Sequence, residues 1–259
     1  MSSCKENGGS ARLLEGKAAI ITGSSRGIGR ATALAFARNG ADLVIHGTRE
    51  EALRDLREEI RALGAGCEYA AGDIGDPGTA RRLAELCLES YGKIDVLVNN
   101  AGVNSRSRFE DLTLEEWERM LRVNLTGVFC ACKCVVPHML ERRSGCIVNM
   151  SSTAGKTAHP NASLSYGVSK AGVNSLTQKL AYDLAPYGIR VNAVCPGPVE
   201  TDMSRQWTEE YRKKVLEDIP LRRLGRGEDV ANTVVFLASE MSAFIAGESI
   251  NVNGGKYMN

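Results

Sequence analysis

Two side chains with useful chemistry, Tyr166 and Lys170, stand four positions apart in the sequence. Positions i and i+4 lie on one face of a helix, so the phenol and the ammonium group would be neighbours. A phenol titrates at about 10, and a nearby lysine cation, helped by a cationic cofactor, lowers that pKa by favouring phenolate. Such a phenol can protonate a ketone oxygen. A chance pair on a surface helix would have the same spacing, so the hypothesis needs support from other segments.

The first support is a glycine-rich turn between a predicted strand and a predicted helix. The apolar run 18–21 leads into Thr-Gly-Ser-Ser-Arg-Gly-Ile-Gly at 22–29, and an alanine-rich stretch follows at 30–37. A turn of this kind presents backbone N–H groups and a helix dipole to a pyrophosphate. A glycine loop without a ligand is the alternative interpretation. The cofactor-binding residues expected here are Gly23, Ser25, Arg26, Gly27, Ile28 and Gly29.

Composition and charge narrow the function classes. The 259 residues are 43% hydrophobic and 24% charged, which suits one large core, and the formal net charge is only +1. No basic surface for nucleic acid is indicated, so we expect no nucleic-acid partner. No apolar stretch is as long as about eighteen residues, and the polar start at 1–10 lacks a signal-peptide core. We expect no membrane partner and a cytoplasmic protein.

Eight cysteines are scattered without paired spacing. In a chain of this length that pattern indicates reduced thiols and no disulfide framework. Cys130, Cys134 and His138 share one face of a predicted helix and are candidate ligands for a soft metal. Three side chains spread over two helical turns cannot converge on one ion, so packing is the better interpretation and no metal is predicted.

Apolar runs alternate with amphipathic segments along the whole chain. This alternation predicts an α/β fold, a single-domain, Rossmann-type, doubly wound parallel sheet of about seven strands with helices on both faces. We divide the chain into a flexible N-terminal arm at 1–12 and one domain at 13–259. The expected strands are 18–21, 43–45, 69–71, 96–98, 147–149, 191–194 and 250–252, and the expected helices are 50–63, 77–91, 114–122, 125–140, 165–184 and 227–238.

Further polar and glycine-containing segments follow the expected strands, where such folds bind ligands. They are Asn99-Asn100-Ala101-Gly102, Ser151-Ser152 and the run from Pro196 to Thr201, together with Asn124. With the turn and the tyrosine pair, these motifs resemble the short-chain dehydrogenase/reductase family from about Gly16 to Gly255. The resemblance implies an NAD(P)-dependent oxidoreductase that interconverts a ketone and a secondary alcohol.

The resemblance also implies roles for individual residues. Tyr166 would be the acid-base, and Lys170 would lower its pKa and hydrogen-bond the nicotinamide ribose. Ser152, rather than Ser151, would hold the substrate oxygen, and Asn124 would support a proton relay. Further cofactor contacts are implied for Asp73, Ile74, Asn100, Ala101, Gly102, Pro196, Gly197, Val199 and Thr201.

The end of the second expected strand decides the expected cofactor. Gly47 stands where an NAD enzyme carries an acidic residue for the ribose 2′-hydroxyl. Without a carboxylate there, and with Arg26 and Arg49 available as cations, the sequence favours NADP(H) over NAD(H).

The substrate class is less sharply indicated. The Gly-Gly-x-Tyr-Met tail resembles 3-oxoacyl-(acyl carrier protein) reductases of fatty acid biosynthesis, with an acyl-thioester substrate and an acyl carrier protein as partner. Arg142 and Arg143 are candidates for binding that acidic carrier, whereas Tyr187 stands where such reductases often have a basic residue. The alternatives are a dehydrogenase of a sugar, polyol or hydroxysteroid, and a non-catalytic dinucleotide-binding sensor or scaffold.

Two expectations concern larger parts of the molecule. The segment 202–222, with Met203, Trp207 and Tyr211, is interpreted either as a mobile lid or as a surface helix. The resemblance further implies a homotetramer in which helices 125–140 and 166–184 pair across two-fold axes.

Overall fold

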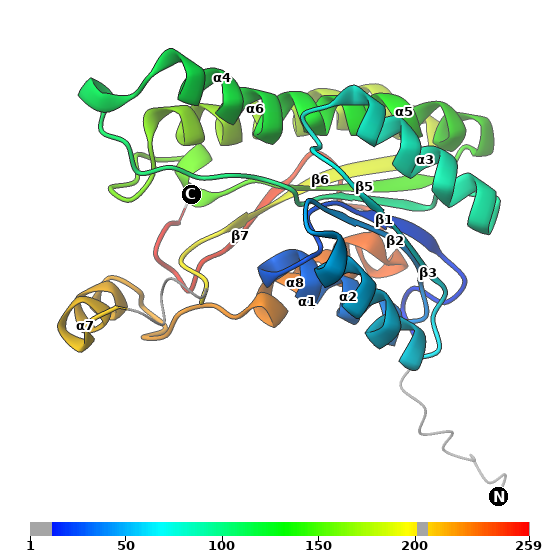
Figure 1. Cartoon of the computed structure of the whole chain (residues 1–259), viewed down its shortest axis with the longest axis horizontal. Helices are drawn as coiled ribbons and strands as arrows, with labels where there is room; N and C mark the ends of the chain where they lie inside the picture. Colours follow the sequence, from blue (N-terminus) through cyan, green and yellow to red (C-terminus); the bar gives the residue numbers. More distant parts are fainter. Residues whose placement is uncertain (1–11, 201–206, 259) are drawn as a thin grey trace, which may run out of the picture.

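The computed structural model describes residues 12–200 and 207–258, which form one seven-stranded parallel sheet (Figure 1). The strand order is β3-β2-β1-β4-β5-β6-β7. The predicted fold class is therefore confirmed, and the order changes direction between β1 and β4. The strands are β1 Ala18–Ile21, β2 Asp42–Gly47, β3 Cys67–Ala71, β4 Val96–Asn99, β5 Gly145–Met150, β6 Ile189–Pro196 and β7 Ser249–Val252.

Helices cover both faces of the sheet (Figure 1). Helices α1, α2 and α8 lie on one face, and α3, α4, α5 and α6 lie on the other. Helix α7 lies beyond the carboxyl ends of the strands. The helices are α1 Gly27–Arg38, α2 Glu50–Ala62, α3 Pro77–Tyr91, α4 Leu114–Leu121, α5 Gly127–Arg142, α6 Leu164–Leu184, α7 Glu209–Glu217 and α8 Gly227–Ala238.

The strands are buried on both faces, which explains why they are continuous apolar runs in the sequence. Alternate residues point to opposite faces of a strand. In β1, Ala19 and Ile21 therefore pack in the core with α1, α2 and α8, whereas Ala18 and Ile20 pack in the core with α3, α5 and α6. The two cores cover both faces of the sheet, so a site is expected at an edge where the strands end.

One expected break between helices is absent from the structure, and several other helix and strand ends differ by a few residues from the sequence expectation. The expected break between helices at 122–125 is a π-helical turn, Arg122–Thr126, so α4 and α5 form one continuous helical run. This run, Leu114–Arg142, is long and apolar enough to cross a membrane by length and composition, with a mean hydropathy of 1.4 in its best window. That window is 44% buried inside the protein, as expected for a helix that covers a sheet.

Arg142 and Arg143 lie just before β5, at the amino ends of the strands. Arg142 donates to Asp95 Oδ1 at 2.8 Å, and Arg143 donates to the carbonyl oxygen of Pro186 at 3.0 Å. Ser152 follows the opposite end of β5, a strand of six residues that spans about 20 Å at ~3.3 Å per residue. These two arginines therefore stand at the amino ends of the strands, away from Ser152, and their carrier-binding role stays a prediction.

The cysteines that the structure describes are free thiols. Burial raises the pKa of Cys67, Cys87 and Cys132 to about 12, so these thiols stay protonated at neutral pH. Cys130 and Cys134 pack partly buried against the core on the α3 side. Within residues 12–200 and 207–258, no group of three potential metal ligands comes together. The expected arm at 1–12 falls almost entirely outside the described residues, so the domain boundaries stay a prediction.

Candidate active site

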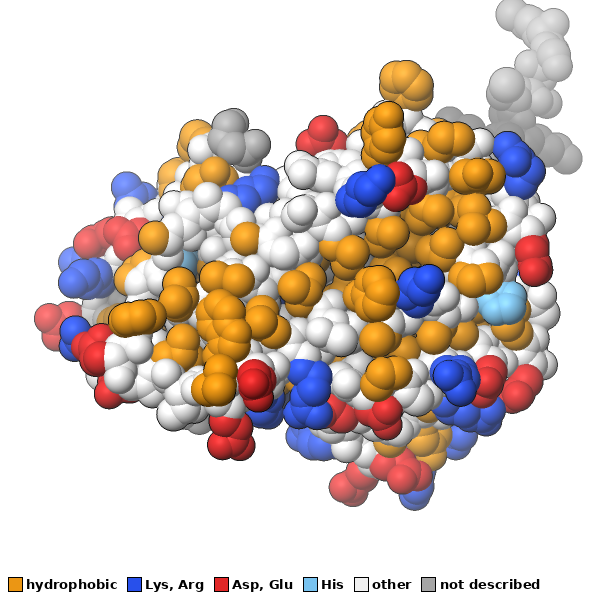
Figure 2. Space-filling view, turned by 90° about the horizontal axis from the view of Figure 1, so that it is seen from above, with side chains coloured by type: hydrophobic (Ala, Val, Ile, Leu, Met, Phe, Trp, Pro, Cys, Tyr) orange, Lys and Arg blue, Asp and Glu red, His pale blue; other side chains and the backbone are white. Residues whose placement is uncertain are grey.

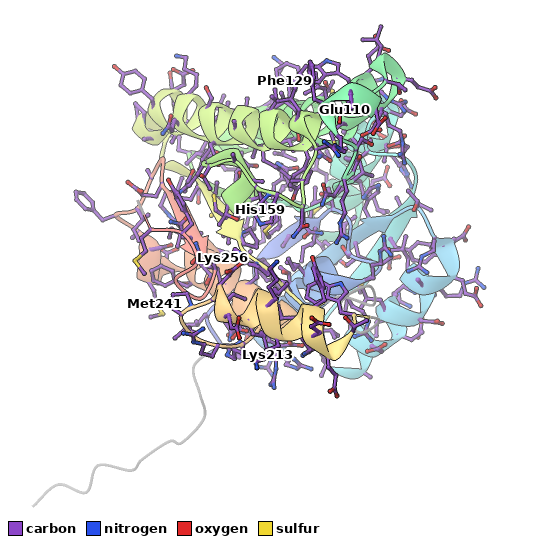
Figure 3. All side chains as sticks on the ribbon, turned by 90° about the vertical axis from the view of Figure 1, so that its left-hand side faces the viewer. Glu110, Phe129, His159, Lys213, Met241 and Lys256 are labelled. Carbon is purple, nitrogen blue, oxygen red and sulfur yellow. The ribbon has the colours of Figure 1, made fainter. Side chains whose placement is uncertain are left out.

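The segments singled out in the sequence meet at the carboxyl edge of the sheet, which faces the viewer in Figure 3. The loops after β1 and β4 diverge there, because the strand order reverses between these two neighbours. A reversal of this kind opens a crevice in which doubly wound folds bind ligands.

The glycine-rich turn after β1 packs directly against the backbone after β4. A Cβ atom added to Gly23, whose φ is +67°, would lie 2.7 Å from Ala101 Cα. A Cβ atom on Gly29 would lie 2.2 Å from the carbonyl oxygen of Gly23. A Cβ atom on Gly27 would meet no atom within 4 Å, so this side of the turn is open. Two glycines thus allow the close approach, and the third leaves space for a ligand.

Asn100 and Thr22 hold the turn in this position. Asn100 Nδ2 donates to the carbonyl oxygens of Thr22 and Gly23, at 2.9 Å each. Thr22 Oγ1 accepts from the backbone N–H groups of Asn100 and Ala101, at 3.0 Å each. The side chain of Asn100 therefore supports the turn from below, while Ala101 and Gly102 continue the chain along the crevice.

The start of α1 suits an anion. Its first turn holds no acidic residue, and Arg26 at the N-cap makes no side-chain capping hydrogen bond. By contrast, Asp76 caps α3 and Ser163 caps α6. The first-turn N–H groups of α1 therefore remain available beside the open face of Gly27. These features fit the diphosphate of a dinucleotide.

Tyr166 and Lys170 lie in the first two turns of α6, which begins at Leu164 under the cap of Ser163. Lys170 is 4% exposed, and its Nζ atom donates to the carbonyl oxygen of Met150 at 2.7 Å. The same Nζ atom lies 5.8 Å from the centroid of the Tyr166 ring. The helix therefore brings the phenol and the ammonium group together, as the spacing predicts.

The two candidate serines have different environments. Ser152 hydrogen-bonds the side chain of Tyr166, and its hydroxyl also accepts from the N–H of Ala154 at 3.1 Å. Ser151 is buried, and its hydroxyl donates to the backbone carbonyl of Lys170 at 3.0 Å. The structure thus brings Ser152 to the phenol and gives Ser151 a position within the core.

The pKa of Tyr166 in the chain without cofactor depends mainly on burial. Burial raises the pKa of Tyr166, and the hydrogen bond with Ser152 opposes this only in part. Burial also lowers the pKa of Lys170 to about 8, so desolvation weakens the charge that was expected to favour phenolate. The chain alone does not lower the tyrosine pKa, and the predicted lowering by Lys170 together with a cofactor cation stays a prediction.

Asn124 is fully buried in the π-helical turn. Its Oδ1 atom accepts from the N–H of Val103, and its Nδ2 atom donates to the carbonyl oxygen of Val103, both at 2.8 Å. Nδ2 also lies 3.1 Å from Ser169 Oγ, one residue before Lys170. Asn124 therefore ties the loop after β4 to α6. The sequence gives no signal for the contact of Asn124 with Val103 or for the π-helical turn. Turns of this kind are common at functional sites.

The residues expected at the adenosine end lie after β2 and β3. Arg26 and Arg49 are exposed, and among the described residues neither forms an ion pair. Gly47 is buried, and a Cβ atom there would lie 3.1 Å from Ser25 Oγ. Asp73 is exposed and lies 3.8 Å from Arg122, an ion pair that the sequence does not indicate. Ile74 is buried beside Gly127.

The segment after β6 lies beside the last strand. The N–H of Gly197 donates to the carbonyl oxygen of Val252 at 3.0 Å, and Val199 forms a parallel bridge with Gly225. Trp207 and Tyr211, at the start of the expected lid, pack edge to face at 5.1 Å. Thr201 and Met203 lie outside the described residues, so the lid remains a prediction.

Comparison with known proteins identifies the family of this chain. The family model for enoyl-(acyl carrier protein) reductase matches residues 23–256. The chain belongs to the short-chain dehydrogenase/reductase family. As a member of this family it is an NAD(P)-dependent oxidoreductase that acts on CH–OH or C=O groups.

Curated relatives and solved structures from this family resemble the whole chain. A 3-oxoacyl-[acyl-carrier-protein] reductase of Thermotoga maritima is 40% identical over 93% of this chain and 98% of its own length. The enzyme of the same name from Staphylococcus aureus is 39% identical over 93% of this chain and 98% of its own. The crystal structure of the Brucella melitensis 3-oxoacyl-[acyl-carrier protein] reductase has a TM-score of 0.90 and 34% identity, covering 96% of this chain and 94% of that one.

A solved structure with a less specific name is equally similar. The putative short-chain alcohol dehydrogenase of Sinorhizobium meliloti has a TM-score of 0.90 and 33% identity, with 95% of this chain and 98% of that one covered. Similarity of fold within the short-chain dehydrogenase/reductase family therefore does not by itself distinguish substrates.

The geometry of the turn leads to a first prediction. Gly29→Ala would force its new methyl group against Gly23 and Asn100, and the turn would have to move. We expect the dissociation constant for NADPH, measured by fluorescence titration, to rise about 10-fold or more, since displaced N–H donors lose charge-assisted hydrogen bonds. Gly78→Ala, in the first turn of α3, is the control, because its Cβ would come no closer than 3.3 Å to Asp76. Unchanged affinity in Gly29→Ala would contradict the placement of the nucleotide at this turn.

Proposed function

We propose that this chain is an NADP(H)-dependent reductase that interconverts the ketone and the secondary alcohol of a 3-oxoacyl thioester, with Tyr166 as the acid-base. The observation that carries the proposal is the arrangement of Ser152, Tyr166 and Lys170 beside the glycine-rich turn. A non-catalytic binding protein would have no need for a phenol, a hydroxyl and a buried lysine at this edge of the sheet.

The substrate carbonyl is held between Ser152 and Tyr166. The hydroxyl of Ser152 donates a hydrogen bond to the carbonyl oxygen, and the phenol of Tyr166 gives that oxygen its proton as negative charge develops. When bound, the nicotinamide supplies the hydride to the carbonyl carbon. The hydrogen bond between the two hydroxyls fixes them in position before the substrate arrives, so the reaction needs little rearrangement.

Lys170 orients the cofactor and shares in the proton supply. One of its N–H groups is used by the carbonyl oxygen of Met150, which leaves two donors for the nicotinamide ribose. Its pKa of about 8 lets it exchange a proton near neutral pH. Because the ammonium group alone does not lower the pKa of Tyr166, the charge of an oxidised nicotinamide is the second cation that favours phenolate.

Asn124 keeps these groups aligned. Through Val103 it positions the loop along which the nicotinamide end of the cofactor would lie, and through Ser169 it contacts the turn of α6 that carries Lys170. The π-helical turn also shifts the backbone hydrogen-bond register around Asn124, which makes this residue suited to support the proton relay.

The 2′-phosphate of NADP(H) fits the end of β2. Gly47 offers no carboxylate to repel a phosphate, and two exposed arginines stand nearby in the chain, Arg26 at the N-cap of α1 and Arg49 at the N-cap of α2. Asp73 and Ile74 follow β3 on the adenine side. These features support NADP(H) over NAD(H).

The names of the relatives support an acyl-thioester substrate carried by an acyl carrier protein. Such carriers are acidic, and exposed basic residues flank the proposed entrance. Arg106 lies in the loop after β4, and Lys213 lies on α7 (Figure 3). Their positive charge would guide an acidic partner to this edge of the sheet. The proposed location of the protein is the cytoplasm.

The face formed by α5 and α6 supports a homotetramer. Figure 2 shows hydrophobic side chains gathered on this side of the molecule. Phe129 on α5 is 48% exposed, and Leu164 on α6 is 49% exposed. A groove of about 470 Å³ runs between Phe129 and Leu176. A second copy of this helix pair would cover the apolar surface, and pairing on two such axes gives four subunits.

A rate measurement tests the proposed function directly. Purified protein is given NADPH with acetoacetyl thioesters of acyl carrier protein and of coenzyme A, and with a ketosugar and a ketosteroid. We expect the thioesters to be reduced. Tyr166→Phe removes the proton donor and keeps the ring, so kcat should fall about 10²-fold or more while the affinity for NADPH changes little.

Tyr182→Phe is the matched control for this substitution, because Tyr182 lies on the same helix and is 81% exposed. It should leave kcat unchanged. Near-normal turnover in Tyr166→Phe would end the assignment of the acid-base, and turnover of the sugar or steroid alone would end the assignment of the substrate class.

Cofactor preference is tested at Arg49. Arg49→Ala should raise the KM for NADPH about 10-fold by removing a contact to the 2′-phosphate, with little effect on the KM for NADH. Arg54→Ala is the control, since Arg54 lies one turn along α2 and pairs with Glu50. Equal effects of Arg49→Ala on both cofactors would move the phosphate contact to another residue.

The assembly is tested by light scattering after size-exclusion chromatography. We expect a mass of about four times the 27.9 kDa of one chain. Phe129→Glu should give a smaller species, because a charge would be buried at the interface. Phe109→Glu, at an even more exposed aromatic residue outside the α5–α6 face, should leave the mass unchanged. A monomeric wild type would contradict the proposal.

A further inference from the structure

His46 is a buried polar residue for which the mechanism above gives no role. It lies in β2 one residue before Gly47, and only 2% of its surface is exposed. Histidine is seldom buried without partners, because a ring nitrogen left without a hydrogen bond costs free energy. Both nitrogens of His46 have partners, and each partner lies in a loop of the proposed nucleotide site.

The ring connects the loops on both sides of β2. The N–H of Gly23, in the glycine-rich turn after β1, donates to His46 Nδ1 at 3.2 Å. His46 Nε2 lies 3.1 Å from the carbonyl oxygen of Gly72, which directly follows β3. Gly72 precedes Asp73, the residue expected at the adenine. One side chain thus links the diphosphate end of the site to its adenine end.

The partners fix the tautomer of the ring. A backbone N–H only donates, so Nδ1 must be the unprotonated acceptor, and a carbonyl oxygen only accepts, so Nε2 must carry the proton. A histidinium ion would direct an N–H group at the N–H of Gly23. Burial lowers the pKa of His46, and the hydrogen bond with Gly72 and the carboxylate of Asp73 oppose this in part, so the ring is neutral at pH 7.

The backbone of β2 holds the same turn. The carbonyl oxygen of His46 accepts from the N–H of Ser24 at 2.7 Å, and that of Gly47 accepts from the N–H of Gly72 at 3.0 Å. With Asn100 on the β4 side, the glycine-rich turn is therefore fixed from two directions. Among the described contacts, the His46 ring is the only one of these side chains that hydrogen-bonds both the glycine-rich turn and the loop after β3.

We propose that neutral His46 is a positioning residue that couples the glycine-rich turn to the loop after β3 and thereby sets the affinity for the dinucleotide. The inference rests on the proposed placement of the nucleotide at this edge. His46 acts through Gly23 and Gly72 and does not itself touch the reacting atoms. These two hydrogen bonds keep the diphosphate donors and the adenine pocket at a fixed separation before the dinucleotide binds, which reduces the entropy lost on binding.

The test compares nucleotide binding with folding stability in variants of the full-length protein. His46→Ala should raise the dissociation constant for NADPH, measured by fluorescence titration, about 10-fold, because both hydrogen bonds are lost. The KM for NADPH should rise similarly while kcat at saturating cofactor changes less than about 2-fold. Val44→Ala, a buried residue two positions earlier on the same side of β2, is the control. It should lower the melting temperature and leave the dissociation constant unchanged.

Two conservative variants separate the hydrogen bonds. In His46→Asn an amide oxygen takes the place of Nδ1 and can accept from Gly23, whereas in His46→Gln an amide nitrogen reaches the place of Nε2 and can donate to Gly72. Each should recover part of the affinity lost in His46→Ala. An unchanged dissociation constant in His46→Ala, or an equal rise in Val44→Ala, would overturn the inference and leave the proposed function intact. A wild type that binds neither NADPH nor NADH would overturn both.

Discussion

The close approach of two backbones is the constraint on which the site depends. The turn after β1 meets the chain after β4 at a distance that leaves no room for a Cβ atom at Gly23 or Gly29. Asn100 fills the space beneath the turn with two hydrogen bonds, and Thr22 completes the contact. Because β1 and β4 are neighbours at the reversal of strand order, this contact also holds the glycine-rich turn at the edge of the crevice.

The proposed catalytic groups are also closely packed and buried. Burial lowers the pKa of Lys170 to about 8, so this side chain is still mostly cationic at pH 7, and burial raises the pKa of Tyr166, so the phenol stays protonated in the protein alone. Burial thus opposes ionisation of the Tyr166 phenol, but it also removes water that would compete for the substrate oxygen. In the proposed mechanism the chemistry is thus divided between the chain, which would supply geometry and a proton, and the cofactor, which would supply hydride and a charge. This division explains why Tyr166 and Lys170 are informative only together with the glycine-rich turn.

The sequence predicted the parts of the structure that follow local rules. Helices α3 and α8 have the expected bounds. Asp76 and Pro77 mark the start of α3, and α8 begins at Gly227 after an arginine-rich turn. The expected strands have the right positions, and β1 has the expected bounds, but the others are short by one to four residues. A polar residue such as His46 extends β2 beyond the apolar run. The π-helical turn at Arg122–Thr126 was missed, because a shift of one residue in hydrogen-bond register leaves the apolar pattern almost unchanged.

Other features of the site depend on distances that only the fold sets. The spacing of Tyr166 and Lys170 indicates proximity, whereas the sign of the tyrosine pKa shift depends on how deeply both are buried. Arg142 and Arg143 show the same limit, because the sequence does not tell that their partners are Asp95 and Pro186. His46 is the converse case. A lone histidine in a strand carries no signal in the sequence, yet the register of β2 between β1 and β3 gives each ring nitrogen a partner in a different ligand-binding loop. Its position follows from the same sheet order that opens the crevice, so the arrangement that creates the site also determines which side chain can stabilise it.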